Sequence, residues 1–330
     1  MVRLGSLSAS ALQRQLSGSG LRIRTGPFGF CLRSASPEVA HGLGRLYDHM
    51  PLLEEGQLAD FTVSVVPGKG LRRWIRPQAC FDFDGQRVFE PLPAAHAYAL
   101  LEWAMNWCVS AHAHQFLIIH AAVLERGGRA LVMPAPPGSG KSTLCAALSL
   151  SGWRLLSDEL ALLDLDTGLF QPLCRPISLK NKSIEIVRGL APFAVFSRVV
   201  EGTAKGSVAH LRVSDDAVAG MDIPARPGWV VFPRYEAGAP TQLSARHRAS
   251  TVAELARNSF NIGVLAKPGF HALIDLVADA HCFDFRYSRL DEARACFDEL
   301  VQVDDGGPVF RPQGGQSRLP GKACLPAANV

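Results

Sequence analysis

The sequence predicts a mixed α/β fold, α+β overall, in which a smaller, mostly β domain precedes a larger domain with a mixed β-sheet. Two observations support this prediction. In the first 92 residues, short apolar runs alternate with turns that contain Gly or Pro, which is typical of successive strands. From residue 115 onward, apolar runs alternate with stretches of helical periodicity, as expected where strands and helices share one core.

The composition is that of a globular protein and excludes several classes. Of the 330 residues, 48% are hydrophobic and 19% are charged, and the net charge is only +4. The basic residues are scattered, so no nucleic-acid partner is expected. No apolar run has the length of a signal peptide or of a membrane span, which predicts a cytoplasmic protein that does not span the membrane. The eight cysteines show no C-x-x-C spacing, which argues against zinc and against a disulfide framework.

The predicted N-terminal domain covers residues 1–92, and residues 93–114 form a linking helix with apolar residues at helical spacing. Strands are expected in the N-terminal domain at residues 21–24, 28–32, 61–66, 71–75 and 88–89, separated by turns. The tail, residues 305–330, is rich in Gly, Pro and Gln and is predicted to be disordered.

The predicted second domain covers residues 115–304 and begins with a strand too apolar to be half exposed. Its expected strands are residues 116–124, 129–133, 154–163, 172–179, 222–233 and 281–287. Its expected helices are residues 143–150, a helix that starts near Asn181, and residues 251–260, 270–280 and 291–300.

The most informative segment lies between the strand at 129–133 and the helix at 143–150. It reads Ala135, Pro136, Pro137, Gly138, Ser139, Gly140, Lys141, Ser142 and Thr143. A strand, a Gly-rich turn and a helix start form the context of a phosphate loop, in which backbone N–H groups and the helix dipole bind phosphate. The alternative is a simple Gly/Ser turn ahead of a helix. The context favours a nucleotide site.

Individual residues of this loop have separate expected roles. Lys141 would neutralise the β- and γ-phosphates of ATP, and the Ser142 hydroxyl would bind Mg²⁺. Ala135 stands where a phosphate loop usually has its first glycine, which predicts a negative φ there. Because proline has no N–H, Pro136 and Pro137 cannot contribute donors, so the phosphate cradle is expected from Gly138 onward.

The acidic pair Asp158-Glu159 follows the apolar residues 154–156, only sixteen residues after Ser142. In a unit of that size, this strand is expected to pair beside the phosphate loop with its acids near the γ-phosphate. Successive strand residues point to opposite faces, so the two acids have separate roles unless the strand ends there. One acid would hold Mg²⁺ and the other would take a proton from an attacking hydroxyl. The alternative is a solvated pair at a sheet edge.

His120 lies in the middle of the apolar run 116–124. A polar side chain in such a run requires a hydrogen-bond partner, and a satisfied core histidine is the default interpretation. Its strand directly precedes the strand of the phosphate loop, however, so a position near the phosphates is the second interpretation.

The segment from His120 to Leu124, the phosphate loop and the Ser157-Asp158-Glu159 triplet together resemble the catalytic domain of HPr serine kinase/phosphorylase. That family closes the corresponding strand with Ala-Asp-Asp, so the second acid here is one methylene longer. Residues 184–190 are similar to the family's Glu-x-Arg-Gly-Leu segment with one extra residue, which carries Glu185 over as a metal ligand together with Ser142 and Glu159. The resemblance covers about residues 115–190.

The whole chain is similar to a divergent branch, the HPr-kinase-related "A" proteins found with exosortase and PEP-CTERM surface-protein systems. The similar stretches are residues 102–108, 176–181 and 205–211.

The resemblance implies an HPr-kinase-like P-loop core and a serine kinase that uses Mg-ATP. Asp158 would be the general base on the serine hydroxyl of a protein or peptide, and Lys141 and Mg²⁺ would stabilise the transferring group. His120 would orient the phosphates. Lys180 and Arg188 are candidate contacts to phosphate or substrate, and a loop carrying Lys205 and His210 would close over the site. The resemblance leaves phosphorolysis and homo-oligomerisation open.

Three other functions are compatible with parts of the sequence. A catalytically weak, nucleotide-binding regulatory protein of a surface-protein sorting or polysaccharide system would explain the departure from Ala-Asp-Asp. A transport ATPase would require a Leu-Ser-Gly-Gly signature, which the sequence lacks. A small-molecule kinase stays open, since no residue pattern identifies the acceptor.

Overall fold

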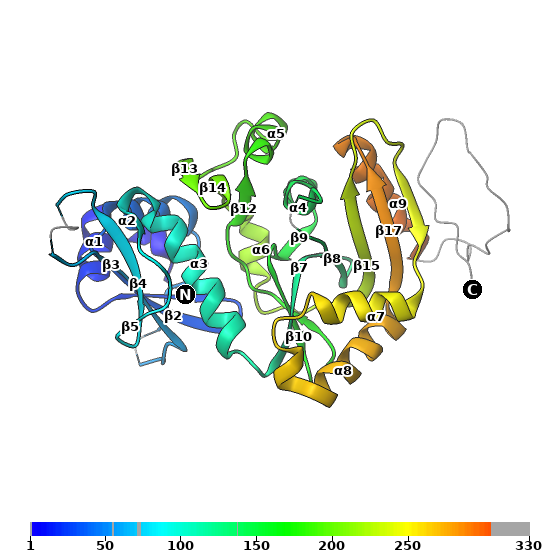
Figure 1. Ribbon diagram of the computed structural model, residues 1–330, viewed down its shortest axis with the longest axis horizontal. Coiled ribbons are helices and arrows are strands. Elements are labelled where there is room, and N and C mark those ends of the chain that lie inside the picture. Colours follow the sequence, from blue (N-terminus) through cyan, green and yellow to red (C-terminus); the bar gives the residue numbers. More distant parts are fainter. Residues whose placement is uncertain (1, 55, 71–73, 137, 305–330) are drawn as a thin grey trace, which may run out of the picture. The chain divides into compact units, whose positions relative to one another are not determined.

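The structure is a computed structural model that describes residues 2–54, 56–70, 74–136 and 138–304, and it confirms a mixed α/β chain. The chain divides into two compact units, and each is built from two separate segments. The first unit joins Met1–Ala113 with Leu173–Asp222, and the second joins His114–Pro172 with the chain from Ile223 onward. Figure 1 shows the elements of both units in chain colours.

The first unit contains a six-stranded sheet in the described part of the chain, with the order β1-β2-β3-β4-β5 and β6 paired to β4. The strands are β1 (Leu21–Thr25), β2 (Phe28–Ser34), β3 (Phe61–Pro67), β4 (Gln78–Phe83), β5 (Gln86–Arg87) and β6 (Leu92–Pro93). β2 and β3 are parallel, and the other neighbours are antiparallel. The expected strand at 71–75 is wrong where it can be examined, since Trp74 and Ile75 form a turn and a bend; residues 71–73 lie outside the described residues. The strand expected at 88–89 falls two residues earlier, at β5.

This part of the chain is not mostly β, as the sequence suggested. It begins with a short 3-10 helix, η1 (Leu4–Ser6), and contains two helices that were not predicted, α1 (Ala9–Ser17) and α2 (Pro37–Leu46). The expected helix at 93–114 is confirmed as η3 (Ala94–His96) followed by α3 (Ala97–His112), which packs on β3 and β4. The predicted linking helix is thus an element of the first unit, which extends to Ala113.

Residues 173–222 return to the first unit, so the expected single domain over 115–304 differs from the observed division. They form a three-stranded sheet of order β12-β14-β13, with helices α5 and α6. The elements are β12 (Ile177–Lys180), α5 (Lys182–Leu190), β13 (Val200–Thr203), β14 (Gly206–Leu211) and α6 (Asp215–Ala219). The expected strand at 172–179 is confirmed only over β12, and the helix expected near Asn181 is α5.

A buried ion pair explains why this segment belongs to the first unit. Arg175 donates from Nη2 to Oε2 of Glu102 on α3 at 2.6 Å, and both side chains are about 95% buried or more. Tyr47 and Tyr98 donate their hydroxyl protons to the other carboxylate oxygen at 2.8 and 2.7 Å. Burial alone would raise the pKa of Glu102, but the positive charge of Arg175 and these hydrogen bonds lower it below its usual value. Sequence periodicity cannot show which core a strand joins, and the pair between Arg175 and Glu102 is one contact that links this segment to α3.

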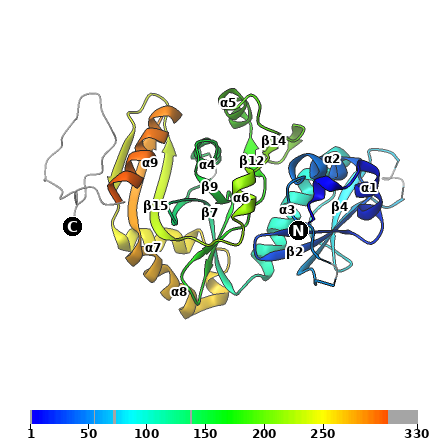
Figure 2. The same cartoon turned by 180° about the vertical axis from the view of Figure 1, so that it is seen from behind.

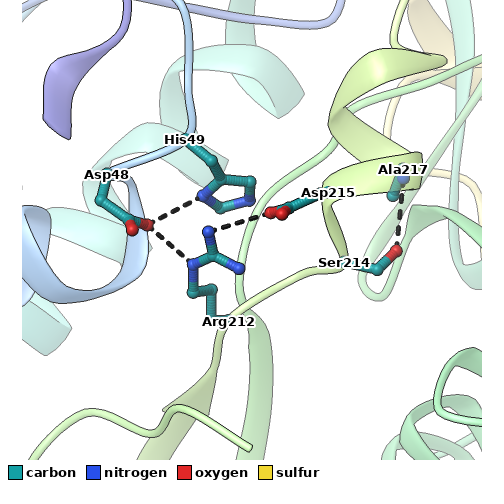
Figure 3. Close-up of polar contacts among 6 residues, drawn as sticks. All are labelled: Asp48, His49, Arg212, Ser214, Asp215 and Ala217. Carbon is teal, nitrogen blue, oxygen red and sulfur yellow. Dashed lines mark hydrogen bonds and ion pairs between the residues drawn. The ribbon is translucent and has the colours of Figure 1, made fainter. Parts of the chain in front are cut away.

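A second polar cluster joins the end of α2 to the segment after β14 (Figure 3). Asp48 accepts hydrogen bonds from Nδ1 of His49 at 3.1 Å and from Nε of Arg212 at 2.7 Å, and Arg212 also reaches Asp215 at 2.9 Å. Ser214 caps α6 by accepting from the N–H of Ala217. Burial, followed by the charge of Arg212, lowers the pKa of His49 below its ordinary value.

The second unit contains an eight-stranded mixed sheet in the part of the chain described, of order β11-β10-β7-β8-β15-β17-β16, with β9 also paired to β7. The strands are β7 (Phe116–Arg126), β8 (Arg129–Pro134), β9 (Arg154–Ser157), β10 (Leu160–Asp164), β11 (Phe170–Gln171), β15 (Arg226–Tyr235), β16 (Gln242–Ala245) and β17 (His281–Tyr287). The strands expected at 116–124, 129–133 and 281–287 are confirmed, and that expected at 222–233 is β15. The strand expected at 154–163 is two strands, interrupted at Asp158-Glu159.

Helices pack on the two faces of this sheet. They are α4 (Lys141–Ser149), α7 (Arg248–Arg257), α8 (Ile262–Asp279) and α9 (Leu290–Asp304). α7 and α8 lie side by side in both views (Figures 1 and 2), and their Leu255 and Leu273 share one core cluster with alternate residues of β7, such as Ile119. Because strand side chains alternate, His120 points to the opposite face, where α4 contacts β7. The expected helices at 251–260 and 270–280 correspond to α7 and to the second part of α8, which bends at Ala266 ahead of Pro268.

Candidate functional site

The candidate site lies at one edge of the second sheet. β8 and β15 are parallel, as are β15 and β17, so the carboxyl ends of all three strands meet at the same edge. Ligands of open α/β sheets bind at the carboxyl ends of the parallel strands. The segment that follows β8, residues 135–140, is called the glycine-rich loop below. It lies at this edge together with Tyr235 and Tyr287, which end β15 and β17.

The backbone of the glycine-rich loop can be described at most of its residues. Ala135 is buried and is not among the residues with positive φ, which confirms the expected negative φ. Pro136 is exposed, and Pro137 lies outside the described residues. Gly138 and Gly140 have φ values of +88° and +87°, in the left-handed region that favours glycine. At Gly138, a Cβ would have no atom of the described residues within 4 Å apart from its chain neighbours, so the loop borders open space there.

Two tyrosines hold the other side of this loop. The N–H of Tyr235 donates to the carbonyl oxygen of Ser139 at 2.8 Å, and the hydroxyl of Tyr287 donates to that of Gly140 at 3.1 Å. The two rings meet edge to face with centroids 5.8 Å apart. A Cβ at Gly140 would overlap the Tyr287 hydroxyl. The strands β15 and β17 therefore fix the position of the loop.

The helix α4 begins directly after Gly140, at Lys141. The first N–H groups of a helix have no partners within it and point toward its N-terminus, where they attract anions. Lys141 is only 8% exposed, whereas Ser142 and Thr143 are half-buried. A buried lysine is uncommon in a folded protein unless it has a partner or a function.

The structure brings His120 next to Lys141. The distance between Lys141 Nζ and His120 Nε2 is 3.3 Å, and His120 is half-buried, with its ring also against Phe260. The backbone N–H of His120 donates a hydrogen bond to the carbonyl oxygen of Asn258 at 2.7 Å. The second interpretation of His120, a place beside the loop, agrees with this geometry.

The acidic pair occupies the break between two strands that both pair with β7. β9 ends where Ser157 pairs with Val123, and β10 begins where Leu160 pairs with His120. Asp158 and Glu159 therefore lie level with the part of β7 that leads to His120. Asp158 is 7% exposed and Glu159 is half-buried, so the two carboxylates have different surroundings, as separate roles require.

β9 was expected beside the glycine-rich loop. It pairs with β7, which lies between β9 and β8, the strand that leads into the loop. The reason is the tight β7–β8 hairpin, whose turn residues Gly127 and Gly128 both have positive φ, so that β7 occupies the neighbouring position itself. β9 and β8 are both antiparallel to β7. They therefore run in the same direction, and the carboxyl end of β9 lies at the same edge as the loop.

The pKa of Cys145, in the first turns of α4, is affected by two charged side chains at this edge of the sheet. Burial raises the pKa of its thiol well above the ordinary value, the nearby Asp158 carboxylate raises it further, and the Lys141 ammonium lowers it. Asp158 and Lys141 thus both act electrostatically on one buried side chain. The start of α4 thus has a lysine, an imidazole and a buried carboxylate in its surroundings.

The residues proposed from sequence as metal ligands come from both units. Ser142 and Glu159 belong to the second unit, whereas Glu185 is exposed on α5 of the first unit. Within the described residues, no group of three or more His, Cys, Asp and Glu side chains could hold a metal ion. A site that relies on a serine hydroxyl, one carboxylate and substrate phosphates is compatible with that finding, because Mg²⁺ keeps few protein ligands.

The other residues suggested by the resemblance also lie in the first unit. Lys180 ends β12 and Arg188 is exposed in the last turn of α5. The expectation of a loop carrying Lys205 and His210 is wrong for His210, which is buried in β14 against Tyr98. Lys205 occupies the turn before β14, with its ammonium 5.0 Å from the Trp103 ring centroid.

Tyr235 and Tyr287 are the site residues that the sequence interpretation missed. Their strands were predicted, but their position beside the loop depends on the strand order β8-β15-β17, which periodicity does not give. The only available signal was a Tyr at or just beyond the carboxyl end of each predicted strand.

No helix in the described ranges is both long and apolar enough to cross a membrane. Comparison of the chain with protein-family models and with curated proteins finds no match, so the geometry of this edge has to support any functional assignment.

Proposed function

We propose that this protein is a kinase that transfers the γ-phosphoryl group of ATP to a serine hydroxyl of a protein or peptide, on an HPr-kinase-like P-loop core formed by the second unit. The observation that carries the proposal is the presence of two buried charged side chains, Lys141 and Asp158, at the sheet edge that also carries the glycine-rich loop. Charged groups are rarely buried unless they are paired or functional, and this position is where α/β sheets bind their ligands.

The backbone of the loop and of the start of α4 is compatible with binding of a nucleoside triphosphate. Gly138 borders open space, and the N–H groups from Gly138 to Thr143 are those that would surround the phosphates. Lys141 would counter their charge, with His120 beside it as a second polar group. A magnesium ion, when bound, would neutralise charge on the β- and γ-phosphates, and the Ser142 hydroxyl and the Glu159 carboxylate are the groups that would hold it.

Asp158 would act as the general base. It would accept the proton of the acceptor hydroxyl while that oxygen bonds to the γ-phosphorus and the bond from this phosphorus to the departing diphosphate breaks. Lys141 would stabilise the negative charge that accumulates on the leaving oxygen. Glu159, which is one residue farther along the chain and more exposed, would take the separate metal role.

The proposal includes a cytoplasmic location, which rests on the apolar pattern of the sequence, and an association with exosortase-type surface-protein systems, which rests on the resemblance. The test is transfer of label from γ-labelled ATP to protein acceptors captured by the Asp158→Asn variant. Wild type should transfer label, and Asp158→Asn should reduce the rate by about 10²- to 10⁴-fold while it still binds ATP.

Asp166→Asn is the matched control, since Asp166 is an exposed carboxylate of the same unit, and it should transfer label like wild type. Nucleotide binding that depends on Lys141, without any transfer or hydrolysis that depends on Asp158, would favour the regulatory protein instead. Loss of ATP binding in Lys141→Ala but not in Lys267→Ala, an exposed lysine of the same unit, tests the nucleotide site itself.

A further inference from the structure

The first unit contains a cavity of about 370 Å³ that the proposed kinase chemistry does not use. Three chain segments line it: the exposed side of α2, the end of α5 and the strand-like segment that precedes β13. The lining residues are His41, Arg45, Arg188, Ala194, Phe196, Ser197 and Arg198, and together they are called the arginine pocket.

The arginine pocket is strongly basic. Its lining contains three arginines and a histidine and no carboxylate. Glu38, one turn before His41 on α2, forms an ion pair with Arg198 at 3.2 Å, which neutralises one of the three positive charges. Two guanidinium charges therefore remain around one concave surface, where the field of like charges is focused.

The arginines are held in place by the floor of the pocket, and Phe196 provides most of that support. Nε of Arg45 donates to the carbonyl oxygen of Phe196 at 2.6 Å, and the guanidinium of Arg188 stacks 5.3 Å from the centroid of its ring. Phe196 is itself buried, and the adjacent Ser197 donates its N–H to the carbonyl oxygen of His210 on β14 at 2.8 Å. The segment that contains Phe196 and Ser197 is thus hydrogen-bonded to the sheet that contains β14.

Arg45 and Arg188 are exposed, but their contacts with Phe196 restrict them more than a surface arginine without such contacts. An arginine on an open surface samples many rotamers and loses that entropy when it binds a ligand. The hydrogen bond of Arg45 and the ring contact of Arg188 remove part of this freedom, so a ligand would meet partly oriented donors. A guanidinium carries five N–H groups, and Arg45 uses one of them for Phe196, which leaves four.

We propose that the arginine pocket binds a small molecule that carries a phosphate monoester or diphosphate group. Oriented guanidinium groups match the tetrahedral, multiply charged oxygens of phosphate in bidentate geometry. The volume falls in the range of small-molecule sites and leaves room for an organic part beyond the phosphate itself. The arginine pocket consists entirely of residues of the first unit, whereas the proposed nucleotide site consists of residues of the second.

The test is calorimetric titration of the whole chain with glucose 6-phosphate and with pyrophosphate, using glucose as the uncharged control and citrate as a carboxylate control. Wild type should bind at least one phosphate probe with a Kd below about 1 mM and should bind glucose not at all. Arg188→Gln and Arg45→Gln should each weaken that binding about tenfold or more. Arg45→Gln removes a hydrogen bond to the Phe196 carbonyl oxygen, whereas Arg188→Gln removes none to the backbone. If Arg45→Gln does not fold, Arg188→Gln alone decides the result.

Two control variants show whether binding depends on the arginine pocket itself. Arg14→Gln removes the same charge from an exposed arginine of the same unit outside the pocket and should bind the probes like wild type. Lys141→Ala should also retain the binding, which distinguishes this site from the glycine-rich loop whether or not the loop binds ATP. The proposal is overturned if neither probe binds up to about 10 mM, if Arg14→Gln weakens binding as much as Arg188→Gln, if only Lys141→Ala loses binding, or if citrate binds more tightly than both probes.

Discussion

Lys141 Nζ and His120 Nε2 lie 3.3 Å apart, so the first residue of α4 is joined to the middle of β7. When the Lys141 side chain is an ammonium it can only donate, and Nε2 of His120 is then the acceptor.

This relationship predicts that His120 supports nucleotide binding through Lys141. His120→Ala should reduce the affinity for a non-hydrolysable ATP analogue by about tenfold, because Lys141 loses a fixed partner, and Lys141→Ala should reduce it further. Calorimetric titration measures both changes. His271→Ala, an exposed histidine of the same unit, should bind like wild type, and equal affinities for all three histidine forms would contradict the role.

Gly140→Ala should damage the glycine-rich loop more than Gly138→Ala. Both positions have positive φ, which costs an L residue about 1–2 kcal/mol, but only at Gly140 does a new Cβ meet the Tyr287 hydroxyl and, at 2.9 Å, Cβ of Tyr235. Thermal unfolding and ATP-analogue titration of the two variants give the comparison. Addition of Tyr287→Phe to Gly140→Ala should restore part of the loss, and the same loss in both single variants would show that the tyrosines do not hold the loop.

Glu102→Gln should strongly destabilise the first unit. The change leaves the Arg175 charge buried without its counter-charge, which costs about 3–5 kcal/mol in the free energy of unfolding. Glu38→Gln breaks an exposed pair of the same unit, in which Arg198 is 65% exposed, and should cost less than about 1 kcal/mol. Urea denaturation measures both values, and similar costs would mean that the buried pair contributes little.

Stability should fall as the pH drops through the titration range of His49. Its pKa is lowered in the folded protein, so between the folded value and the ordinary value of 6.5 the unfolded chain binds more protons. The contribution of His49 is therefore complete above about pH 6.5 and is lost as the pH falls toward the folded pKa. The lowered pKa of Asp48 acts in the same direction at lower pH. His49→Asn should flatten the dependence of the unfolding temperature on pH below 6.5, and an unchanged slope would contradict this origin.

Much of the second unit could be predicted from the sequence because its strands are long apolar runs with clear punctuation. The helices α1 and α2 gave a weaker signal. α1 buries only Leu12 and Leu16, and α2 contains Gly42 and Gly44, which lower its helix propensity. Gly42 is nevertheless required, because the Tyr98 ring packs against its Cα with no space for a Cβ. The packing of Tyr98 therefore requires a glycine at position 42, and this glycine made α2 hard to recognise from the sequence.

In the candidate site, too, local sequence patterns could be predicted and contacts that depend on tertiary structure could not. The glycine-rich loop, Lys141 and Asp158 were predicted because a local pattern carries them. Tyr235 and Tyr287 were not, since their contact with the loop depends on strand order. The interruption of the strand at Asp158-Glu159 was also not predicted, because Leu160 to Leu163 continue the apolar run without a Gly or Pro.

The division of the first unit into two chain segments also has a consequence for synthesis. A chain that emerges from the ribosome folds its domains in order where each is contiguous. Here Glu102 and the helix α3 are made long before Arg175, so the earlier segment must wait for residues 173–222 while residues 114–172, part of the second unit, lie in between. Neither unit can be completed during translation until residue 222 has been added, and the nascent chain carries a carboxylate destined for burial that does not yet have its counter-charge.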